Sequence, residues 1–449
     1  MTFEEMIAAA ASDVDADKLE SAHSRACYLV RQKPEDARLA FLMAHCHLKA
    51  GRPETAYYIY RFAQKFKDYD GPQLWNQIGM SLAEMERDDD AEKWYCRALQ
   101  RGPTDVTYSS LASIYAKKGD PRKAVWAAEE ALKLNPSSDE AKWNGALALL
   151  KLHQWKRGWE WYDTMLGAPK LRPHPPSLEG IDLPLWDGKG GNVLITGEQG
   201  LGDEIMFASM LPEAIRDAEE VILSVEPRLI GLFQRSFPEA VVVSRRGKNL
   251  VLPREIKITH RMAMGSLGGL YRNDDSEFPG TPYLKPCPHR SAMWRALLDK
   301  LPGKRVGLMW RGGVGGLDEG LRTLDLHEMT DLLNRDVSWV SLNHLASASE
   351  ECERFYDQTG VMIHHYPFVH SSDYDDTAAL VSQLDAVVTV TATVAHIAGA
   401  LGVETHVLVP SKPQWRYGAE GDTMPWYKSL KLYRQTDKWP FEEIPVGNR

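Results

Sequence analysis

Residues 192–203 read NVLITGEQGLGD, an apolar run that leads directly into a glycine-rich loop. The run 192–196 predicts a buried strand, and residues 204–217 after the loop predict a helix. Glycines in such a loop permit a tight turn and a close approach of the backbone to a ligand. The spacing is not the dinucleotide-binding fingerprint, because Glu204 and Ile205 stand where a further glycine is needed.

The same alternation of strands and helices continues to the C-terminal end. Strands are predicted at 221–225, 240–243, 305–310, 338–342, 386–390 and 405–409, and helices at 228–237, 326–334, 376–383 and 394–401. The elements form two sets, near 192–290 and near 305–430. This order predicts two Rossmann-like lobes of parallel sheet that face each other across a cleft, with ligands at the carboxyl ends of the strands.

The front third has a different, repeating pattern of small residues. Two series recur at intervals of 33 to 35 residues: Ala10, Ala44, Gly79, Ala112 and Ala146, then Ala22, Ala56, Ala91, Ala124 and Gly158. Tyr60, Tyr95 and Tyr162 follow the second series by four positions, and Pro34, Pro103 and Pro136 recur as helix stops. The pattern resembles the tetratricopeptide repeat (TPR), a helix–turn–helix unit of 34 residues. Such repeats stack into a solenoid whose concave face binds a peptide or protein, and the alternatives are a spacer or an oligomerisation surface.

Composition narrows the class of protein. The chain has 449 residues and a formal net charge of −9, which disfavours nucleic acid as the main partner. Its five cysteines form no C-x-x-C pair, so a zinc site or a disulfide framework is not expected. The start is acidic rather than signal-like, and no apolar run reaches a membrane-spanning length of about 18 residues, so we expect a cytoplasmic protein.

A proline-rich segment separates the two halves. Pro169, Pro173, Pro175, Pro176 and Pro184 fall close together and indicate an extended linker. The predicted domains are therefore a repeat domain at 1–167, a linker at 168–191, a first lobe at 192–295 and a second lobe at 296–449. Trp186 is expected to pack against the first lobe.

The first lobe offers one candidate for acid–base chemistry. Asp203 lies at the start of the predicted helix 204–217, where it faces the cleft either as a general base or as a simple helix cap. Glu198, Gln199, Gly200 and Gly202 of the same loop are expected to line the cleft.

The second lobe offers candidates for binding phosphate. Arg311, beside the glycine-rich loop 312–316, and Arg322 can grip a diphosphate, and the alternative for each is an ordinary surface arginine. Thr391 and Thr393 lie where a strand runs into a helix, whose free N–H groups suit a phosphate. His396 on the first turns of that helix either faces the nucleotide or packs inside.

Seven motifs in order resemble the TPR-containing members of the bacterial heptosyltransferase-like family. They are PLWDG at 184–188, GEQGLGDEI at 197–205, VGLMW at 306–310, RTL at 322–324, DTAAL at 376–380, VAHIAGALG at 394–402 and PWY at 425–427. The resemblance covers about residues 180 to 435. It implies a glycosyltransferase-B fold and a nucleotide-sugar donor bound mainly by the second lobe. It also implies inversion at the anomeric carbon with no cofactor and no essential metal.

The resemblance also assigns roles to two residues. Asp203 matches the catalytic aspartate of the family, and Arg322 matches its donor-lobe cation. One departure is visible, because Thr391-Ala392 stands where the family usually has Asp-Thr. Since the family aspartate contacts the donor, the departure leaves open which donor is used and whether the chain is active.

These features predict a glycosyltransferase that modifies a hydroxyl of a protein captured by the repeats. The architecture is similar to that of repeat-bearing O-glycosyltransferases, including those that modify bacterial flagellins. The alternatives are a saccharide, lipid or nucleic-acid acceptor, the last least favoured by the acidic charge, and a catalytically inactive TPR scaffold. Whether the chain forms a homo-oligomer stays open.

Overall fold

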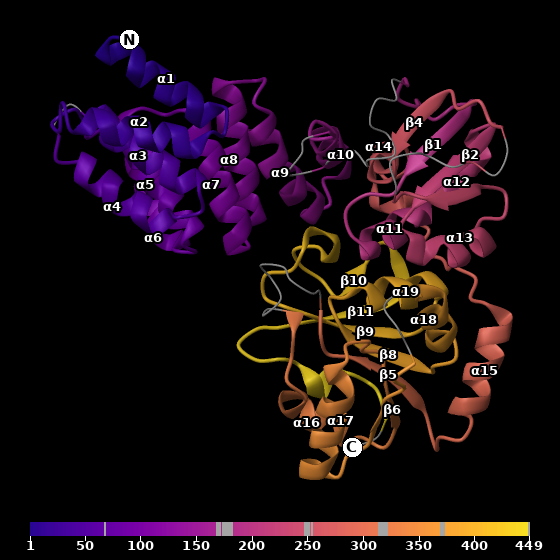
Figure 1. Cartoon of the computed structure of the whole chain (residues 1–449). Helices are drawn as coiled ribbons and strands as arrows, with labels where there is room; N and C mark the ends of the chain where they lie inside the picture. Colours follow the sequence, from indigo (N-terminus) through magenta and orange to yellow (C-terminus); the bar gives the residue numbers. More distant parts are fainter. Residues whose placement is uncertain are drawn as a thin grey trace. The chain divides into compact units, whose positions relative to one another are not determined.

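The computed structural model describes residues 1–66, 69–167, 172, 183–246, 252, 255–312, 322–368 and 373–447. Contacts between Cα atoms divide the chain into two compact units, Met1–Ala148 and Leu149–Arg449. Figure 1 shows helices in the first unit, and sheets with surrounding helices in the second. The finer domain limits at residues 167, 191 and 295 stay predictions, and most of the predicted linker lies outside the described residues.

Every regular element that the structure describes in the first unit is a helix. They are α1 (Phe3–Asp15), α2 (Leu19–Val30), α3 (Ala37–Lys49), α4 (Pro53–Ala63), α5 (Pro72–Glu84), α6 (Asp88–Arg101), α7 (Asp105–Lys118), α8 (Pro121–Leu134) and most of α9 (Asp139–Lys151). Consecutive helices pack as pairs, and each pair contacts the next pair. The predicted helical repeat is therefore confirmed.

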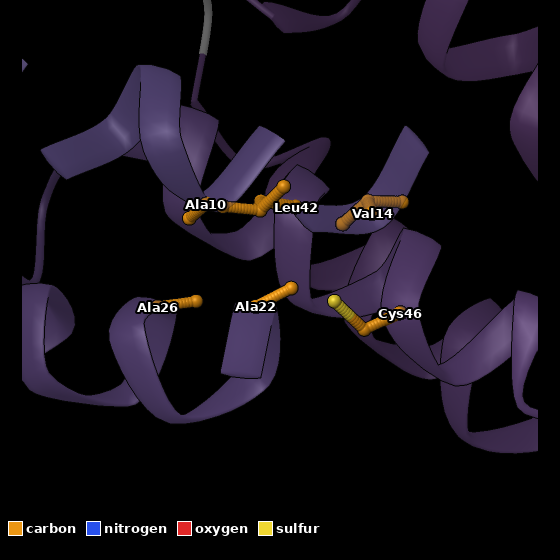
Figure 2. Close-up of a cluster of buried hydrophobic side chains, with 6 residues drawn as sticks. All are labelled: Ala10, Val14, Ala22, Ala26, Leu42 and Cys46. Atoms are coloured by element: carbon orange, nitrogen blue, oxygen red, sulfur yellow. The ribbon is translucent and has the colours of Figure 1, made fainter. Parts of the chain in front are cut away.

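The small residues of the two series lie where the paired helices cross. The alanines of both series have no exposed surface. At Gly79, a Cβ would lie only 2.5 Å from Cε1 of Tyr95, so no side chain fits where α5 crosses α6. Figure 2 shows the first such cluster, in which Ala10 of α1 and Ala22 and Ala26 of α2 lie with Leu42 and Cys46 of α3. The period of small residues thus marks close helix contacts.

Helix ends in the first unit also follow the sequence. Three helices end shortly before the prolines named as stops: Val30 before Pro34, Arg101 before Pro103 and Leu134 before Pro136. Proline lacks the N–H that the next turn of the helix would need, so each helix ends at a fixed place.

Helix α10 (Trp155–Asp163) continues the small-residue series inside the second unit. A Cβ at Gly158 would lie 2.6 Å from Cδ2 of Leu150. Trp159 is buried and donates from Nε1 to the carbonyl of Arg272 at 2.8 Å. The helix packs on α14 (Leu267–Tyr271), so the last helix of the series is built into the α/β unit.

The first sheet of the second unit is parallel, with the order β3-β2-β1-β4. Its strands are β1 (Asn192–Thr196), β2 (Glu220–Val225), β3 (Val241–Ser244) and β4 (His260–Ala263), and its helices are α11 (Leu201–Phe207), α12 (Leu211–Asp217) and α13 (Ile230–Ser236). The first three strands confirm the prediction, and β4 was not predicted. The helix expected at 204–217 is instead divided at Ala208–Met210, because Pro212 lacks the N–H that an uninterrupted helix requires. Trp186 packs as expected, with its ring buried and its N–H on the carbonyl of Gly190 at 2.8 Å.

The second sheet has seven strands in the order β10-β11-β9-β8-β5-β6-β7. All neighbouring strands are parallel except β10 and β11. The strands are β5 (Arg305–Met309), β6 (Ser338–Ser341), β7 (Ile363–His364), β8 (Ala386–Val390), β9 (Thr405–Val409), β10 (Thr423–Met424) and β11 (Tyr427–Arg434). The helices are α15 (Pro288–Leu298), α16 (Thr330–Leu333), α17 (Ser347–Thr359), α18 (Tyr374–Val381) and α19 (Thr393–Leu401). The four predicted strands are confirmed, whereas α15, α17, β7, β10 and β11 were not predicted.

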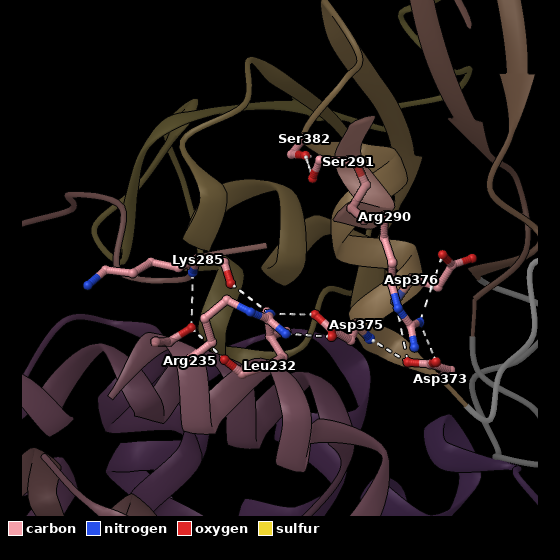
Figure 3. Close-up of polar contacts among 11 residues, drawn as sticks. Leu232, Arg235, Lys285, Arg290, Ser291, Asp373, Asp375, Asp376 and Ser382 are labelled. Carbon is pink, nitrogen blue, oxygen red and sulfur yellow. Dashed lines mark hydrogen bonds and ion pairs between the residues drawn. The ribbon is translucent and has the colours of Figure 1, made fainter. Parts of the chain in front are cut away.

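The two sheets and their helices, called here the first lobe (192–271) and the second lobe (288–434), contact each other through helices. Helix α11 packs on α19, and α13 packs on α18. Arg235 of α13 forms a paired contact with Asp375 of α18, with both N···O distances at 2.7 Å. Figure 3 shows this contact beside Arg290, which pairs with Asp373 just before α18. The salt bridge between Arg235 and Asp375 therefore joins the two lobes in addition to the packing of their helices.

Three features concern the class of protein. All five cysteines are free thiols. Within the described ranges, no group of three or more His, Cys, Asp or Glu side chains is arranged to hold a metal ion. None of the described helices combines the length and the apolar character needed to cross a membrane.

Candidate functional site

The loop between β1 and α11 is shaped by its glycines and by one carboxylate. A Cβ at Gly197 would lie 2.5 Å from Cδ of Glu204, so only glycine fits there. Gln199 has a left-handed backbone, with φ at +59°. Asp203 accepts a hydrogen bond on Oδ2 from the N–H of Gly200 at 3.2 Å. Gly200 is the N-cap of α11 and Asp203 is its third residue, so Asp203 is not the N-cap considered, although one of its two oxygens caps the N–H of Gly200.

The other oxygen of Asp203 faces the second lobe. Oδ1 accepts a hydrogen bond from Nη2 of Arg416, and the two groups form an ion pair. Arg416 lies in the short 3-10 helix η9 (Trp415–Tyr417), which follows strand β9. Each of the two side chains is 14% exposed. A carboxylate of one lobe therefore meets a cation of the other in a largely buried position.

The start of α19 lies against the start of α11. A Cβ at Gly202 would lie 3.0 Å from Cδ2 of His396 and 3.7 Å from Cα of Thr393. Ala392 is the N-cap of α19, and no side chain caps this end. Helix starts carry unpaired N–H groups and partial positive charge, so this meeting point favours an anion.

Thr391 and Arg322 lie close together beside this helix start. A Cβ at Gly312 would lie 2.9 Å from Cβ of Arg322 and 3.4 Å from the carbonyl oxygen of Thr391. Oγ1 of Thr391 is buried without a hydrogen-bond partner among the residues that the structure describes. Burial raises the pKa of Tyr417 to about 12, and the charges of Arg416, Asp203 and Arg322 all act on that hydroxyl. Arg322 therefore belongs to the same electrostatic neighbourhood as the Asp203–Arg416 pair.

Arg311 lies in a different environment. Its Nε and Nη2 contact the two oxygens of Glu351 on α17 at 3.1 and 2.9 Å. It lines a pocket of about 230 Å³ together with Thr323, His327 and Phe355. The structure thus pairs Arg311 with α17, and a contact of Arg311 with a donor stays a prediction. Residues 313–316 of the predicted loop lie outside the described residues.

Glu198 and Gln199 hold the loop in place. Glu198 is buried, and its oxygens contact Nε and Nη2 of Arg172 at 2.5 and 2.7 Å. It also accepts from the N–H of Gly265 at 2.8 Å. Gln199 hydrogen-bonds the hydroxyl of Tyr162 in α10. Both residues were expected to line the cleft. In the structure the carboxylate of Glu198 instead forms a buried ion pair with Arg172.

His396 is buried at the contact of the two lobes. Its Nδ1 lies 3.3 Å from the hydroxyl oxygen of Tyr427. Burial lowers the pKa of His396 well below its usual value, and the charge of Arg416 acts in the same direction. A neutral imidazole packed against Gly202 fits the alternative of a packed histidine, and a contact with the nucleotide stays a prediction.

The sequence did not single out Arg416. The stretch QWRY at 414–417 follows β9 and so lies near the carboxyl end of a parallel strand, where ligands bind in such sheets. That rule could have pointed to Arg416. The segment has no helical or strand period, so no pattern drew attention to it.

Two sequence comparisons with known proteins indicate the class of protein to which this chain is similar. Family models described as tetratricopeptide repeat match residues 72–105 and 110–173. Protein FlbA of Caulobacter vibrioides is 28% identical over 468 residues, which span 91% of this chain and 76% of FlbA. The chain therefore carries TPR repeats in front of a mixed α/β region with parallel sheets, and it has a relative that matches over most of both lengths.

Two solved structures are similar to part of this chain. The thermophilic TPR protein TTC0263 of Thermus thermophilus has a TM-score of 0.31 and 20% identity, over 33% of this chain and 82% of its own. PilF of Pseudomonas aeruginosa has a TM-score of 0.35 and 16% identity, over 48% of this chain and 85% of its own.

Proposed function

We propose that this chain is an inverting glycosyltransferase of the glycosyltransferase-B fold. It moves a sugar from a nucleotide-sugar to a hydroxyl of a protein that the TPR repeats hold. The observation that carries the proposal is the position of Asp203 opposite Arg416, beside the uncapped start of α19. The motifs shared with the heptosyltransferase-like family support the same assignment.

The second lobe supplies the donor site in this proposal. The diphosphate binds at the start of α19, where unpaired N–H groups and the hydroxyl of Thr391 act as donors. The backbone of Arg322 lies beside that of Thr391, and the guanidinium of Arg322 adds positive charge to the site. Groups fixed in advance around the leaving diphosphate stabilise the charge that develops as the sugar departs.

The reaction is a direct displacement. The acceptor hydroxyl gives its proton to Asp203, and its oxygen attacks the anomeric carbon from the face opposite the diphosphate. The bond between the anomeric carbon and the phosphate oxygen breaks, and the nucleoside diphosphate leaves with the electron pair. Attack from the opposite face inverts the configuration. The family resemblance implies that no metal is essential.

The TPR repeats support a protein as the acceptor. Arrays of this kind present an extended concave surface, and their usual partner is a peptide or a protein. The alternatives are an acceptor that is a saccharide, a lipid or a nucleic acid. The identity of the sugar and of the acceptor residue is left to experiment.

A catalytically inactive TPR scaffold is the second candidate. The observation that favours it is Thr391, which occupies the position of a donor-contacting aspartate in the family. The repeats alone are consistent with such a protein-binding scaffold.

A thermal-shift screen of nucleotide-sugars separates the two candidates. A donor at 100 times its dissociation constant stabilises the folded state by about 2.7 kcal/mol, so one nucleotide class should raise the Tm. Arg322→Ala should weaken the shift. Arg295→Ala is the matched control, because Arg295 is an exposed arginine of the same lobe whose Nε donates to Gln383. If no nucleotide-sugar shifts the wild type, the enzyme proposal fails and the scaffold remains.

A further inference from the structure

Arg416 uses only part of its hydrogen-bonding capacity. Nη1 donates to Oε1 of Gln414, and Nη2 donates to Oδ1 of Asp203. Nε is buried and has no hydrogen-bond partner among the described residues. A buried N–H without an acceptor is costly, and its presence in a folded protein calls for an explanation.

Two other arginines of the same unit show what a complete contact looks like. Arg172 places Nε and Nη2 on the two oxygens of Glu198, at 2.5 and 2.7 Å. Arg311 does the same with Glu351, at 3.1 and 2.9 Å. This edge of a guanidinium matches two oxygens of one carboxylate or phosphate. In Arg416 only Nη2 of this edge donates to an oxygen of Asp203, and Nε has no acceptor among the described residues.

Asp203, in turn, already accepts one hydrogen bond on each of its two oxygens in this arrangement. Oδ2 accepts from the N–H of Gly200, and Oδ1 accepts from Arg416. A general base must direct an oxygen at the proton that it removes. The contact with Arg416 therefore competes with a substrate hydroxyl for Oδ1 of Asp203.

We propose that Arg416 exchanges partners when the donor binds. Two phosphoryl oxygens of a nucleoside diphosphate take the Nε–Nη2 edge, and Oδ1 of Asp203 is released toward the acceptor hydroxyl. This inference rests on the proposed function and deepens it, because it makes Arg416 a diphosphate-binding residue and a positioning residue for Asp203. The start of α19 lies against α11 and favours an anion there.

The exchange has a thermodynamic consequence that a purely structural ion pair lacks. If Asp203 and the anion compete for one edge of Arg416, then removal of the Asp203 charge must strengthen anion binding. The coupling is reciprocal, because each ligand of Arg416 weakens the other by the same factor. A salt bridge that lies away from the anion site, such as the one between Arg235 and Asp375, gives no such gain when it is broken.

Isothermal titration calorimetry of the full chain with inorganic pyrophosphate tests whether Arg416 exchanges Asp203 for an anion. Asp203→Asn should bind pyrophosphate about fivefold more tightly than the wild type, and Arg416→Gln about tenfold more weakly. Arg416→Lys keeps the charge but lacks the two-nitrogen edge, so it should also bind more weakly than the wild type. Asp375→Asn alters the other contact between the lobes and should leave pyrophosphate affinity unchanged.

The outcomes separate the exchange of partners from the donor site on which it rests. Tighter binding by Asp203→Asn, with weaker binding by either Arg416 variant, supports the exchange even if no sugar transfer is ever detected. Equal binding by the wild type and Asp203→Asn overturns the exchange and leaves the donor site standing. Absence of pyrophosphate binding in the wild type overturns both. If Arg416→Gln fails to fold, the Asp203→Asn and Arg416→Lys titrations still decide the question.

Discussion

Among the described residues, two ion pairs between the lobes differ in how completely their hydrogen bonds are made. Arg235 and Asp375 share two contacts of 2.7 Å, and Nη1 of Arg235 also donates to the carbonyl of Lys285 at 3.1 Å. Asp203 and Arg416 share one contact, and Nε of Arg416 remains buried without a described partner. In the first pair both oxygens of Asp375 contact the guanidinium, whereas in the second pair Nε of Arg416 is left as a donor that a ligand could use.

The difference indicates which of the two contacts belongs to a site. An ion pair between the lobes does not by itself identify a functional site, because one is present at Arg235–Asp375 and another at Asp203–Arg416. An unsatisfied buried donor costs free energy and calls for an explanation, and a ligand or a second conformation that uses the donor is one such explanation. The region around Asp203 adds an uncapped helix start and the unpartnered hydroxyl of Thr391, within the described residues.

The largest expected effect is on sugar transfer. With the donor found by screening, Asp203→Asn should lower kcat/KM by about 10²- to 10⁴-fold, because the acceptor loses its general base. Asp375→Asn, in the complete ion pair, should change kcat/KM by less than about threefold. Wild-type transfer rates in Asp203→Asn, measured by release of nucleoside diphosphate, would remove Asp203 from the reaction.

The next effect concerns Glu204, which follows Asp203 but is directed into its own lobe. Burial raises the pKa of Glu204 to about 7, although its neighbour Arg245, 2.8 Å away, acts in the opposite direction. The folded protein therefore keeps this proton up to about pH 7, whereas the unfolded chain loses it near the ordinary glutamate pKa of 4.5. The stability that this proton provides is complete below pH 4.5 and is lost as the pH rises through 7.

Glu204→Gln should remove this pH dependence. Between pH 4 and pH 8, the wild type should lose up to about 3 kcal/mol of unfolding free energy relative to the variant. Urea unfolding at a series of pH values measures the difference. A constant gap between the two proteins across this range would show that Glu204 is not protonated in the folded state.

A smaller effect is expected at the complete ion pair. Arg235→Ala removes the cation from Asp375, whose side chain is 11% exposed. Since both partners keep some contact with solvent, the free energy of unfolding of the α/β unit should fall by about 1–3 kcal/mol. Chemical denaturation checks this value, and Arg295→Ala serves as the control. A loss below about 0.5 kcal/mol would mean that packing alone joins α13 to α18.

The smallest effect is expected where the two helix starts meet. Gly202→Ala places a Cβ 3.0 Å from Cδ2 of His396, so the neighbour must shift by a few tenths of an ångström. The expected cost is about 1 kcal/mol of stability. A matching change at Gly269, where a Cβ meets only Cβ of Trp159 at 3.7 Å, should cost less. Thermal melts of the two variants give the comparison, and equal melting temperatures would count against a tight contact at Gly202.

The repeats and most strands could be predicted from the sequence, because each depends on a local period. Close crossings require a small residue once in each repeat, which is why Ala22 and Gly79 stood out. Strands β1, β2 and β8 are short apolar runs buried in parallel sheets. The break in the helix after β1 depends on Pro212, a single residue inside an otherwise helical pattern.

The site was only partly predictable, because its contacts join residues far apart in the sequence. Asp203 was found from its loop, but its partner Arg416 lies 213 positions later in a segment without a period. Glu198 was expected to line the cleft because it lies in the same loop. Its ion pair with Arg172 could not be predicted, because Arg172 lies in a proline-rich stretch without helical or strand periodicity. Residue type and local spacing identify candidates, whereas pairing decides which of them remain available to a ligand.

The proposed reaction requires that the two lobes enclose a diphosphate opposite one carboxylate. A crystal structure of the wild-type chain with the nucleoside diphosphate identified by screening tests it most directly. We expect phosphoryl oxygens at the start of α19, within hydrogen-bond distance of Nε and Nη2 of Arg416, and an Asp203 side chain that no longer contacts Arg416. A nucleotide bound elsewhere, with the Asp203–Arg416 contact unchanged, would contradict it.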